Sequence, residues 1–113
     1  MSDCIFCKII NNEIKPDIVL ETDSVLAFHD NNPQAPTHVL IIPKRHIPTM
    51  NDLEPEDAEL MGKLLLAARE VADQEGVSGN YRTTINCGRD GGQEVFHIHL
   101  HLLGGRPMVW PPG

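Results

Sequence analysis

The sequence predicts a single α+β domain over residues 1–113, in which a five-stranded antiparallel sheet is accompanied by one long and one short helix. A length of 113 residues allows one compact domain and no more. Five short apolar runs are separated by turn-forming residues, and their short connections favour antiparallel pairing. Apolar residues make up 41% of the chain and charged residues 22%, which excludes a disordered chain.

The first half of the chain begins with a short helix over Cys4–Asn11, because apolar residues repeat there at a spacing of four. Strands are expected over Ile18–Leu20 and Val25–Phe28, with a polar pair between them that suits a hairpin turn. Prolines and asparagines make Asn31–Pro36 a loop. The apolar run His38–Pro43, closed by proline, is the third strand.

The second half contains the one long helix, expected over Pro55–Glu75. Proline suits its first position, acidic residues suit its positive end, and Gly76 ends it. A fourth strand is expected over Tyr81–Asn86 and a tight loop over Gly88–Gly92. The alternating run Val95–Leu103 predicts the fifth strand.

The long helix has a wide apolar face that requires cover from the sheet. Its members are Leu60, Met61, Leu64, Leu65, Ala68, Val71 and Ala72. The breadth of this face leaves room for a second contact. Simple core packing and a dimer interface therefore both remain open.

The charge balance is acidic, with nine basic and 16 acidic side chains and a formal net charge of −7. A nucleic-acid binder needs a basic face to displace counterions, so this balance argues against a nucleic-acid partner. Eight of the acidic side chains lie between Asp52 and Glu75, where we expect them to form a solvated helix face. Beyond Asn80, three arginines face only two acidic residues, so a phosphate ligand stays compatible with this part of the chain.

The N-terminal sequence lacks the basic and then apolar pattern of a signal peptide. The longest apolar runs, Val39–Ile42 and Leu64–Ala68, are too short to span a bilayer. Three cysteines cannot all pair within one chain. We therefore expect a cytoplasmic protein with reduced thiols and no membrane partner.

Three histidines, His97, His99 and His101, alternate with apolar residues near the end of the chain. On a strand all three imidazoles would project from one face, while the apolar residues enter the core. A catalytic metal centre could use such an array. Alternatively, one neutral imidazole attacks phosphorus while its neighbours donate hydrogen bonds to the phosphoryl oxygens. The preceding segment, Gly91–Glu94, favours attack on phosphorus, because paired glycines let backbone N–H groups approach an anion.

The segment His97–Leu103 followed by Gly104-Gly105-Arg106 resembles the signature of the histidine triad (HIT) family, in its Hint branch. The similarity extends over Cys4–Ile10, Ala27–Asp30 and Pro33–His38, and to the Trp-Pro-Pro-Gly end. It implies a HIT-like fold and a homodimer that extends the sheet. It also implies a hydrolase that binds purine nucleotides and cleaves P–N bonds, as in AMP amides or AMP-lysine, through a nucleotidylated histidine.

The resemblance also implies roles for individual residues. His99 matches the nucleophile and His101 the phosphate contact, while His38 and His97 match supporting histidines. The remaining nucleotide-binding positions are Phe6, Ile9 and Phe28 for the base, Asp30 with Asn31 for the ribose, Asn86, Gly92, Gln93 and Glu94 on the phosphate side, and Trp110, which reaches the partner subunit's site. Many animal members carry serine where this chain has Glu94, so the resemblance leaves the handling of the leaving group and the substrate preference open.

The pair Cys4-x-x-Cys7 is compatible with buried thiols, a redox site or a metal site. Some bacterial members of the family carry this pair with a histidine in a Lys-x-His-Ile segment, which matches His46 here. The resemblance then implies a structural zinc held by Cys4, Cys7, His46 and His97, with no cofactor required for the chemistry. Zinc on His97 would leave His99, His101 and His38 as the catalytic set.

Other functions remain open beside the phosphoramidase. A metal-dependent hydrolase would use the three histidines as ligands and lose activity on chelation. A nucleotide-binding interaction protein would show only incidental catalysis. Within the same family, a dinucleotide polyphosphate hydrolase is the alternative.

Overall fold

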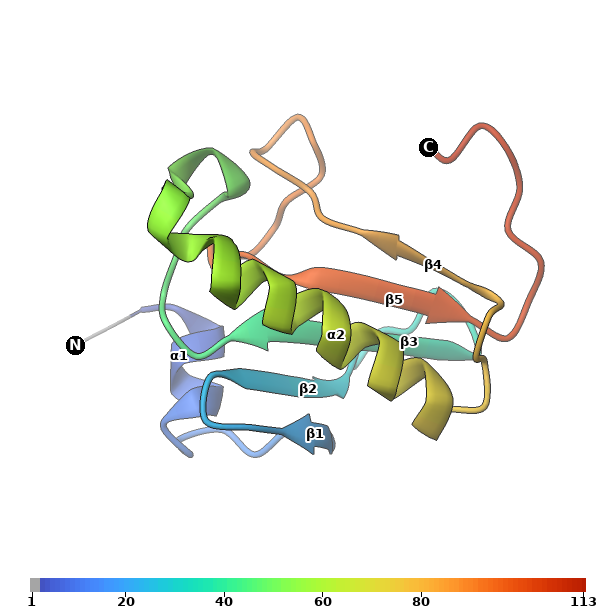
Figure 1. Ribbon diagram of the computed structural model, residues 1–113, viewed down its shortest axis with the longest axis horizontal. Coiled ribbons are helices and arrows are strands. Elements are labelled where there is room, and N and C mark those ends of the chain that lie inside the picture. The colour runs from blue at the N-terminus through green and yellow to red at the C-terminus, as the bar shows by residue number, and fades with distance from the viewer. Residues whose placement is uncertain (1–2) are drawn as a thin grey trace.

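A computed structural model describes residues 3–113 and contains a five-stranded antiparallel sheet with the strand order β1-β2-β3-β5-β4 (Figure 1). The elements are α1 (Ile5–Ile10), β1 (Ile18–Glu21), β2 (Val25–His29), β3 (Thr37–Pro43), the 3₁₀ turns η1 (Met50–Asp52) and η2 (Pro55–Asp57), α2 (Ala58–Gln74), β4 (Tyr81–Thr84) and β5 (Leu100–Gly104). The α+β class and the antiparallel sheet are therefore confirmed.

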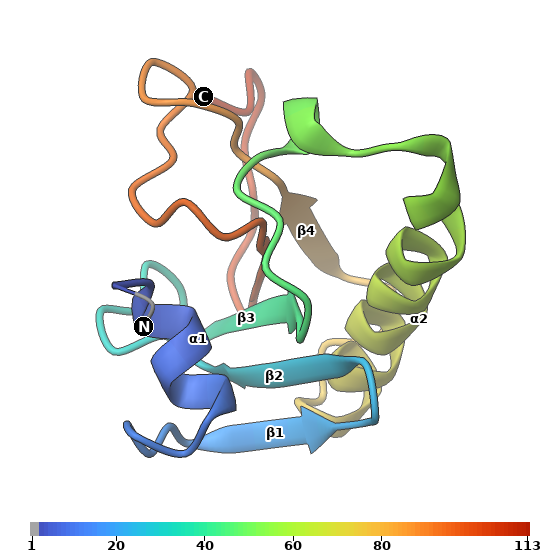
Figure 2. The ribbon, with the colours of Figure 1, turned by 90° about the vertical axis from the view of Figure 1, so that its left-hand side faces the viewer.

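The two helices lie on opposite faces of the sheet (Figure 2). Successive strand residues point to opposite faces, so the sheet has two apolar layers. The layer under α2 contains Val25, Ala27, Val39, Ile41, Leu100 and Leu102 with Leu64, Ala67, Ala68, Val71 and Ala72 of the helix. The layer under α1 is smaller and contains Phe6, Ile9, Leu26, Phe28, Leu40 and Ile42. The smaller layer leaves part of that face for polar side chains.

The fifth strand is shorter than predicted, because residues 95–99 lie outside the sheet and β5 begins at Leu100. Its partner β3 ends at Pro43, which has no N–H to donate to a neighbouring strand. The N–H of Ile98 instead donates to the oxygen of Ile47 over 2.6 Å. The fourth strand likewise stops at Thr84 and not at Asn86.

The long helix begins with the 3₁₀ turn η2 and continues as α2. Asp57 is buried at this junction, where its Oδ2 accepts the Glu54 N–H over 2.8 Å and its Oδ1 pairs with Arg45. The sheet does not cover Leu65, since this residue is 58% exposed within the described chain. Leu65 lies at the flank of the stripe that is buried against the sheet. That stripe consists of Leu64, Ala67, Ala68, Val71 and Ala72. Within residues 3–113, no helix has the length and apolar character needed to cross a lipid bilayer.

His29 connects the sheet to the end of the long helix. Its Nδ1 lies 2.9 Å from Oδ2 of Asp17, and its Nε2 lies 2.8 Å from Oε1 of Glu75 at the C-cap of α2. The hydrogen bond that His29 donates to Glu75, together with the one it donates to Asp17, raises the pKa of His29 above 6.5 although burial opposes it. The charged imidazole therefore joins three segments.

The H29Q variant tests this connection. Because the folded-state pKa is raised, the stabilisation is fully present below the unfolded-state pKa of about 6.5 and is lost as the pH rises through the folded-state value. The bridge is partly exposed, so we expect the variant to lower the free energy of unfolding by up to about 1 kcal/mol near pH 5.5 and by less near pH 9. Urea unfolding of both proteins measures the difference, and an equal loss at both pH values contradicts it.

Candidate functional site

Four histidines meet on the face of the sheet that carries α1. His38 lies in β3 and His101 in β5, while His97 and His99 lie in the segment that leads into β5. The ring centroids of His99 and His101 are 4.9 Å apart, and those of His38 and His101 are 5.2 Å apart. Leu100 and Leu102 point the other way, into the layer under α2, and Ile98 is fully buried. The predicted alternation therefore persists although the first part of the segment is not a strand.

The tautomer of His99 follows from one hydrogen bond. Its Nδ1 lies 2.8 Å from the main-chain oxygen of His97. A carbonyl oxygen only accepts, so Nδ1 carries the proton and Nε2 presents its lone pair. Burial lowers the pKa of His99, which keeps the ring neutral near pH 7. A neutral, oriented imidazole of this kind is suited to nucleophilic attack.

The tautomers of His38 and His101 follow from a chain of hydrogen bonds. The N–H of Gln34 donates to Nδ1 of His38 over 3.0 Å, so the proton of the neutral His38 ring is on Nε2. This Nε2 lies 2.9 Å from Nδ1 of His101, which must accept and therefore carries its proton on Nε2. Burial lowers the pKa of both rings, and burial with the neighbouring His99 and His38 lowers that of His101 to about 4. His101 thus offers a neutral N–H donor beside the lone pair of His99.

The three residues predicted for the base lie in the apolar layer under α1. Phe6 meets Phe28 edge to face at 5.6 Å between ring centroids. The same Phe6 ring also contacts His99 at 5.1 Å and His97 at 5.8 Å. Ile9 is buried in the same layer. One residue of α1 therefore joins this layer to the candidate nucleophile.

Asp30 follows β2 and lies close to the histidines. Its Oδ2 is 3.5 Å from Nε2 of His38, and its Oδ1 accepts the N–H of Asn32 over 2.8 Å. The carboxylate thus keeps capacity to accept hydroxyl donors. Asn31 beside it is exposed.

The glycine loop differs from the expectation that its N–H groups are available to an anion. The N–H of Gly92 donates to Arg89 oxygen over 3.0 Å, and that of Gln93 donates to Gly88 oxygen over 3.0 Å. The Gln93 side chain is 4% exposed, donates to the oxygens of Pro48 and Val95, and accepts from Gly88 N–H. The structure therefore places Gln93 as a residue that holds the loop. Asn86 donates to the oxygen of Gly92 over 3.3 Å.

The four residues predicted to bind metal converge within the described chain, with all ligand atoms within 4.8 Å of one another. Nδ1 of His97 lies 3.4 Å from Sγ of Cys4, 3.6 Å from Sγ of Cys7 and 3.2 Å from Nδ1 of His46. Sγ of Cys7 lies 3.4 Å from Nδ1 of His46. A tetrahedral zinc site has nitrogens about 3.3 Å apart and nitrogen and sulfur about 3.6 Å apart, from bond lengths of about 2.05 and 2.3 Å. The donor set and its spacing fit zinc.

The tautomer of His97 supports the same fit. Its Nε2 lies 2.8 Å from the oxygen of Pro43 and therefore carries the proton. Nδ1 is left with the lone pair that faces the cluster, which is the arrangement of a metal-bound histidine with a carbonyl partner. Burial lowers the pKa of His97 and keeps it neutral. His97 also provides the carbonyl that orients His99, so one residue joins both groups.

A second group, Asp30, His38 and His101, also brings three potential ligands within 4.8 Å. The Gln34 N–H occupies Nδ1 of His38, so Nε2 carries a proton and offers no lone pair to a metal. The 2.9 Å between the two imidazole nitrogens is a hydrogen-bond distance. This arrangement disfavours the metal-dependent hydrolase that would use these histidines as ligands.

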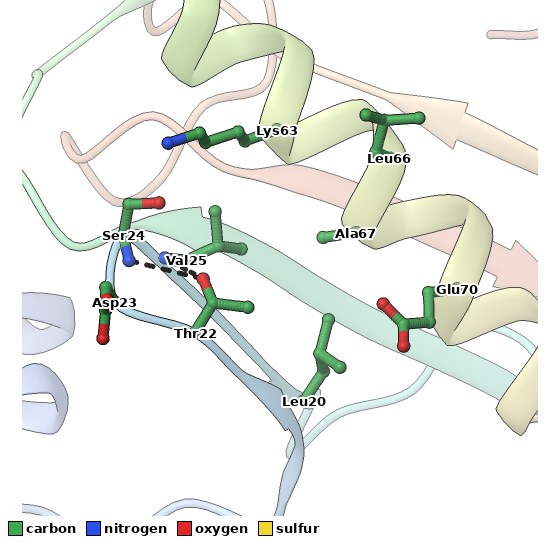
Figure 3. A pocket seen from close by; sticks show the side chains of 9 residues that line it. All are labelled: Leu20, Thr22, Asp23, Ser24, Val25, Lys63, Leu66, Ala67 and Glu70. Atoms are coloured by element: carbon green, nitrogen blue, oxygen red, sulfur yellow. Dashed lines mark hydrogen bonds between the residues drawn. The ribbon is translucent and has the colours of Figure 1, made fainter.

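Two of the hollows in the described chain lie outside the group of His38, His97, His99 and His101. One of about 370 Å³ lies between α2 and the β1–β2 hairpin and is lined by residues of both, among them Lys63, Glu70 and Thr22 (Figure 3). Its lining includes none of the four histidines. Another of about 450 Å³ is lined by Asp3, Cys4, Ile5, His46, Glu94, Val95 and Phe96. Glu94 thus lies beside the cluster of Cys4, Cys7, His46 and His97, which we call the cysteine–histidine cluster.

The C-terminal tail, which comes after β5 in the chain, contacts the edge strand β4. Nη2 of Arg82 in β4 donates to the oxygen of Val109 over 2.8 Å. Trp110 is 82% exposed. Its predicted contact with a partner subunit stays a prediction.

Main-chain groups are the functional partners that sequence reasoning missed. The N–H of Gln34 and the oxygen of Pro43 set the tautomers of His38 and His97. Every residue has a carbonyl and every residue except proline has an N–H, so the sequence contains no signal for these roles.

A neutral, oriented histidine among three further histidines on one face of an antiparallel sheet is the arrangement expected of a histidine triad hydrolase. The chain belongs to the HIT family, since a family model of the HIT domain matches residues 11–108. It is 52% identical over 107 residues to the purine nucleoside phosphoramidase of Escherichia coli strain K12, covering 94% of this chain and 90% of that protein.

Two further relatives support the family and the fold. An uncharacterised HIT-like protein of Synechocystis is 56% identical over 111 residues, which are 98% of this chain and 97% of that protein. The crystal structure of a HIT family hydrolase from Legionella pneumophila superposes with a TM-score of 0.96 at 54% identity, covering 98% of this chain and 100% of that chain.

Proposed function

We propose that this protein is a purine nucleoside phosphoramidase that cleaves the P–N bond of AMP amides, with AMP-lysine as one such substrate. The observation that carries the proposal is the hydrogen bond from Nδ1 of His99 to the oxygen of His97, which leaves the Nε2 lone pair for phosphorus. The name of the Escherichia coli relative supports the substrate class.

The reaction takes two displacements. Nε2 of His99 forms a bond to phosphorus as the P–N bond breaks, and the leaving nitrogen takes the electron pair of that bond and a proton from the solvent, which the attacking water of the second step returns. Nε2–H of His101 donates to a phosphoryl oxygen in both steps. Water then breaks the bond between phosphorus and His99, which releases the nucleoside monophosphate and restores the neutral imidazole.

The nucleotide is held by the surfaces beside the histidines. The apolar layer of Phe6, Ile9 and Phe28 receives the purine. The free acceptor capacity of Asp30 suits the ribose hydroxyls. Asn31 lies beside Asp30 on the ribose side. The phosphate and its leaving group are bordered by Asn86, Gly92 and Glu94, while Gln93 holds the loop.

We also propose a structural zinc on Cys4, Cys7, His46 and His97. The donor spacing and the His97 tautomer support it. A closed set of four protein ligands leaves no position for water, so the metal contributes folding energy and not chemistry. Thiolate ligands fit a reducing compartment, and we accordingly place the protein in the cytoplasm.

A homodimer across β4 is the third part of the proposal. β4 is an edge strand whose outer side has no neighbour in the sheet of the described chain, and a second copy would extend the sheet there. Leu65 at the flank of α2 and the exposed Val109 and Trp110 supply apolar surface. Sedimentation at the 12.5 kDa mass of one chain would reject the dimer.

A comparison of substrates tests the proposed reaction. We expect an AMP amide to be hydrolysed with a much higher kcat/KM than a diadenosine polyphosphate, and activity to persist after removal of loosely bound metal with a chelator. The reverse preference would favour the dinucleotide polyphosphate hydrolase. Loss of activity that only an added divalent metal restores, without change in fold, would favour metal-dependent hydrolysis.

A further inference from the structure

We propose that Arg106 and the main-chain N–H of Gln34 are positioning groups that fix the tautomer of His101 through His38. The inference rests on the proposed function, because it concerns the donor that faces the phosphoryl group. Neither group touches the nucleotide in this scheme. Both act by holding the loop 31–36 against the start of β3.

The sheet register brings these groups together. β3 and β5 are antiparallel, with Thr37 opposite Gly104, so the loop before β3 lies beside the chain that leaves β5. The guanidinium of Arg106 donates to the oxygen of Gln34, from Nη2 over 3.0 Å and from Nε over 3.4 Å. An arginine that donates twice to one carbonyl restricts the position of the loop more than a single bond does.

Gly105 allows this approach. Its φ is +89°, a conformation that side chains rarely adopt, and a Cβ there would lie 2.8 Å from Cβ of Pro36. The chain after β5 therefore packs directly on the loop. This close packing and the arginine hold the same loop from two positions.

The position of the loop then determines which ring nitrogen carries the proton in His38 and in His101. Gln34 N–H can only donate, so Nδ1 of His38 can only accept. His38 must then donate from Nε2 to Nδ1 of His101. If the Gln34 donor were absent, His38 could carry its proton on Nδ1 and accept with Nε2. His101 would then donate from Nδ1 and present a lone pair, which repels a phosphoryl oxygen.

The Q34P variant tests the proposal, because proline has no main-chain N–H, although its ring also fixes φ and occupies the place of the hydrogen, so R106M is measured beside it. The matched control is Q34A, which keeps the N–H and loses the side-chain bond from Gln34 to Asn32 oxygen. Imidazole ¹⁵N chemical shifts report the tautomer of each histidine directly. We expect the wild type and Q34A to show His38 and His101 protonated on Nε2, and Q34P to show both in mixed or reversed tautomers. We also expect kcat/KM for an AMP amide to fall about 10- to 100-fold in Q34P alone.

Unchanged tautomers of His38 and His101 in a folded Q34P protein would overturn the proposal. If Q34P does not fold, R106M decides by the same two measurements, with R106K as the variant that keeps a donor. Wild-type tautomers together with wild-type kcat/KM in R106M would then overturn it. The spectra are independent of substrate, so a wild-type protein with the expected tautomers and no phosphoramidase activity would count against the proposed function and leave the positioning intact.

Discussion

Replacement of His99 by alanine is expected to reduce the hydrolysis of an AMP amide by about 10⁴-fold or more, since the nucleophile is lost. Its oriented lone pair at Nε2 is the group that we propose forms the bond to phosphorus. Binding of AMP is expected to stay within about threefold, because the apolar layer of Phe6 and Phe28 and the carboxylate of Asp30 are unchanged. Steady-state kinetics and titration calorimetry measure the two effects.

H29Q is the matched control for this variant. It also removes an imidazole, but from the bridge between Asp17 and Glu75 and not from the candidate site. We expect it to retain wild-type turnover at pH 7. Turnover by H99A within about tenfold of the wild type would contradict a nucleophilic role for His99, because loss of a nucleophile costs far more.

Substitution of Cys4 by serine is expected to release zinc and to destabilise the fold. Metal analysis is expected to fall from about one zinc per chain to nearly none. The free energy of unfolding is expected to fall by about 4 kcal/mol, which corresponds to free zinc at roughly 1,000 times its dissociation constant. The main-chain N–H of Cys7 that now donates to Cys4 Sγ can donate to serine, which is a good N-cap, so loss of the helix cap contributes little.

C87S is the matched control, because Cys87 is exposed and lies outside the cysteine–histidine cluster. It is expected to keep both the zinc and the stability of the wild type. Protein purified without zinc, or zinc that C4S retains in full, would reject the metal site. Equal losses of stability in C4S and C87S would show that the metal is not the cause.

Much of the fold could be predicted because its determinants are local. Apolar runs, turn residues and the proline before α2 placed the helices and strands close to their observed bounds. The fifth strand begins at Leu100 and not at the predicted Val95, since its extent depends on where β3 ends. That end is Pro43, which lies far from β5 in the sequence. The exposure of Leu65 could not be predicted either, because the direction of α2 over the sheet decides which flank is covered.

The candidate site also has a part that the sequence predicts and a part that it does not. The alternation of His97, His99 and His101 is a side-chain pattern, and the sequence contains it in full. The contacts of Gln93 could not be predicted, because its buried amide donates to the oxygen of Pro48, which lies far away in the sequence. The tautomers depend on main-chain groups, which no side-chain pattern encodes.

The most direct test is to trap the covalent intermediate. The protein is mixed with an AMP amide, quenched within the first turnover under neutral denaturing conditions, and examined by mass spectrometry with peptide mapping. The account predicts a mass increase of one adenylyl group located on His99, and no increase in H99A. Turnover of the amide without any adduct, or an adduct on another residue, would contradict it.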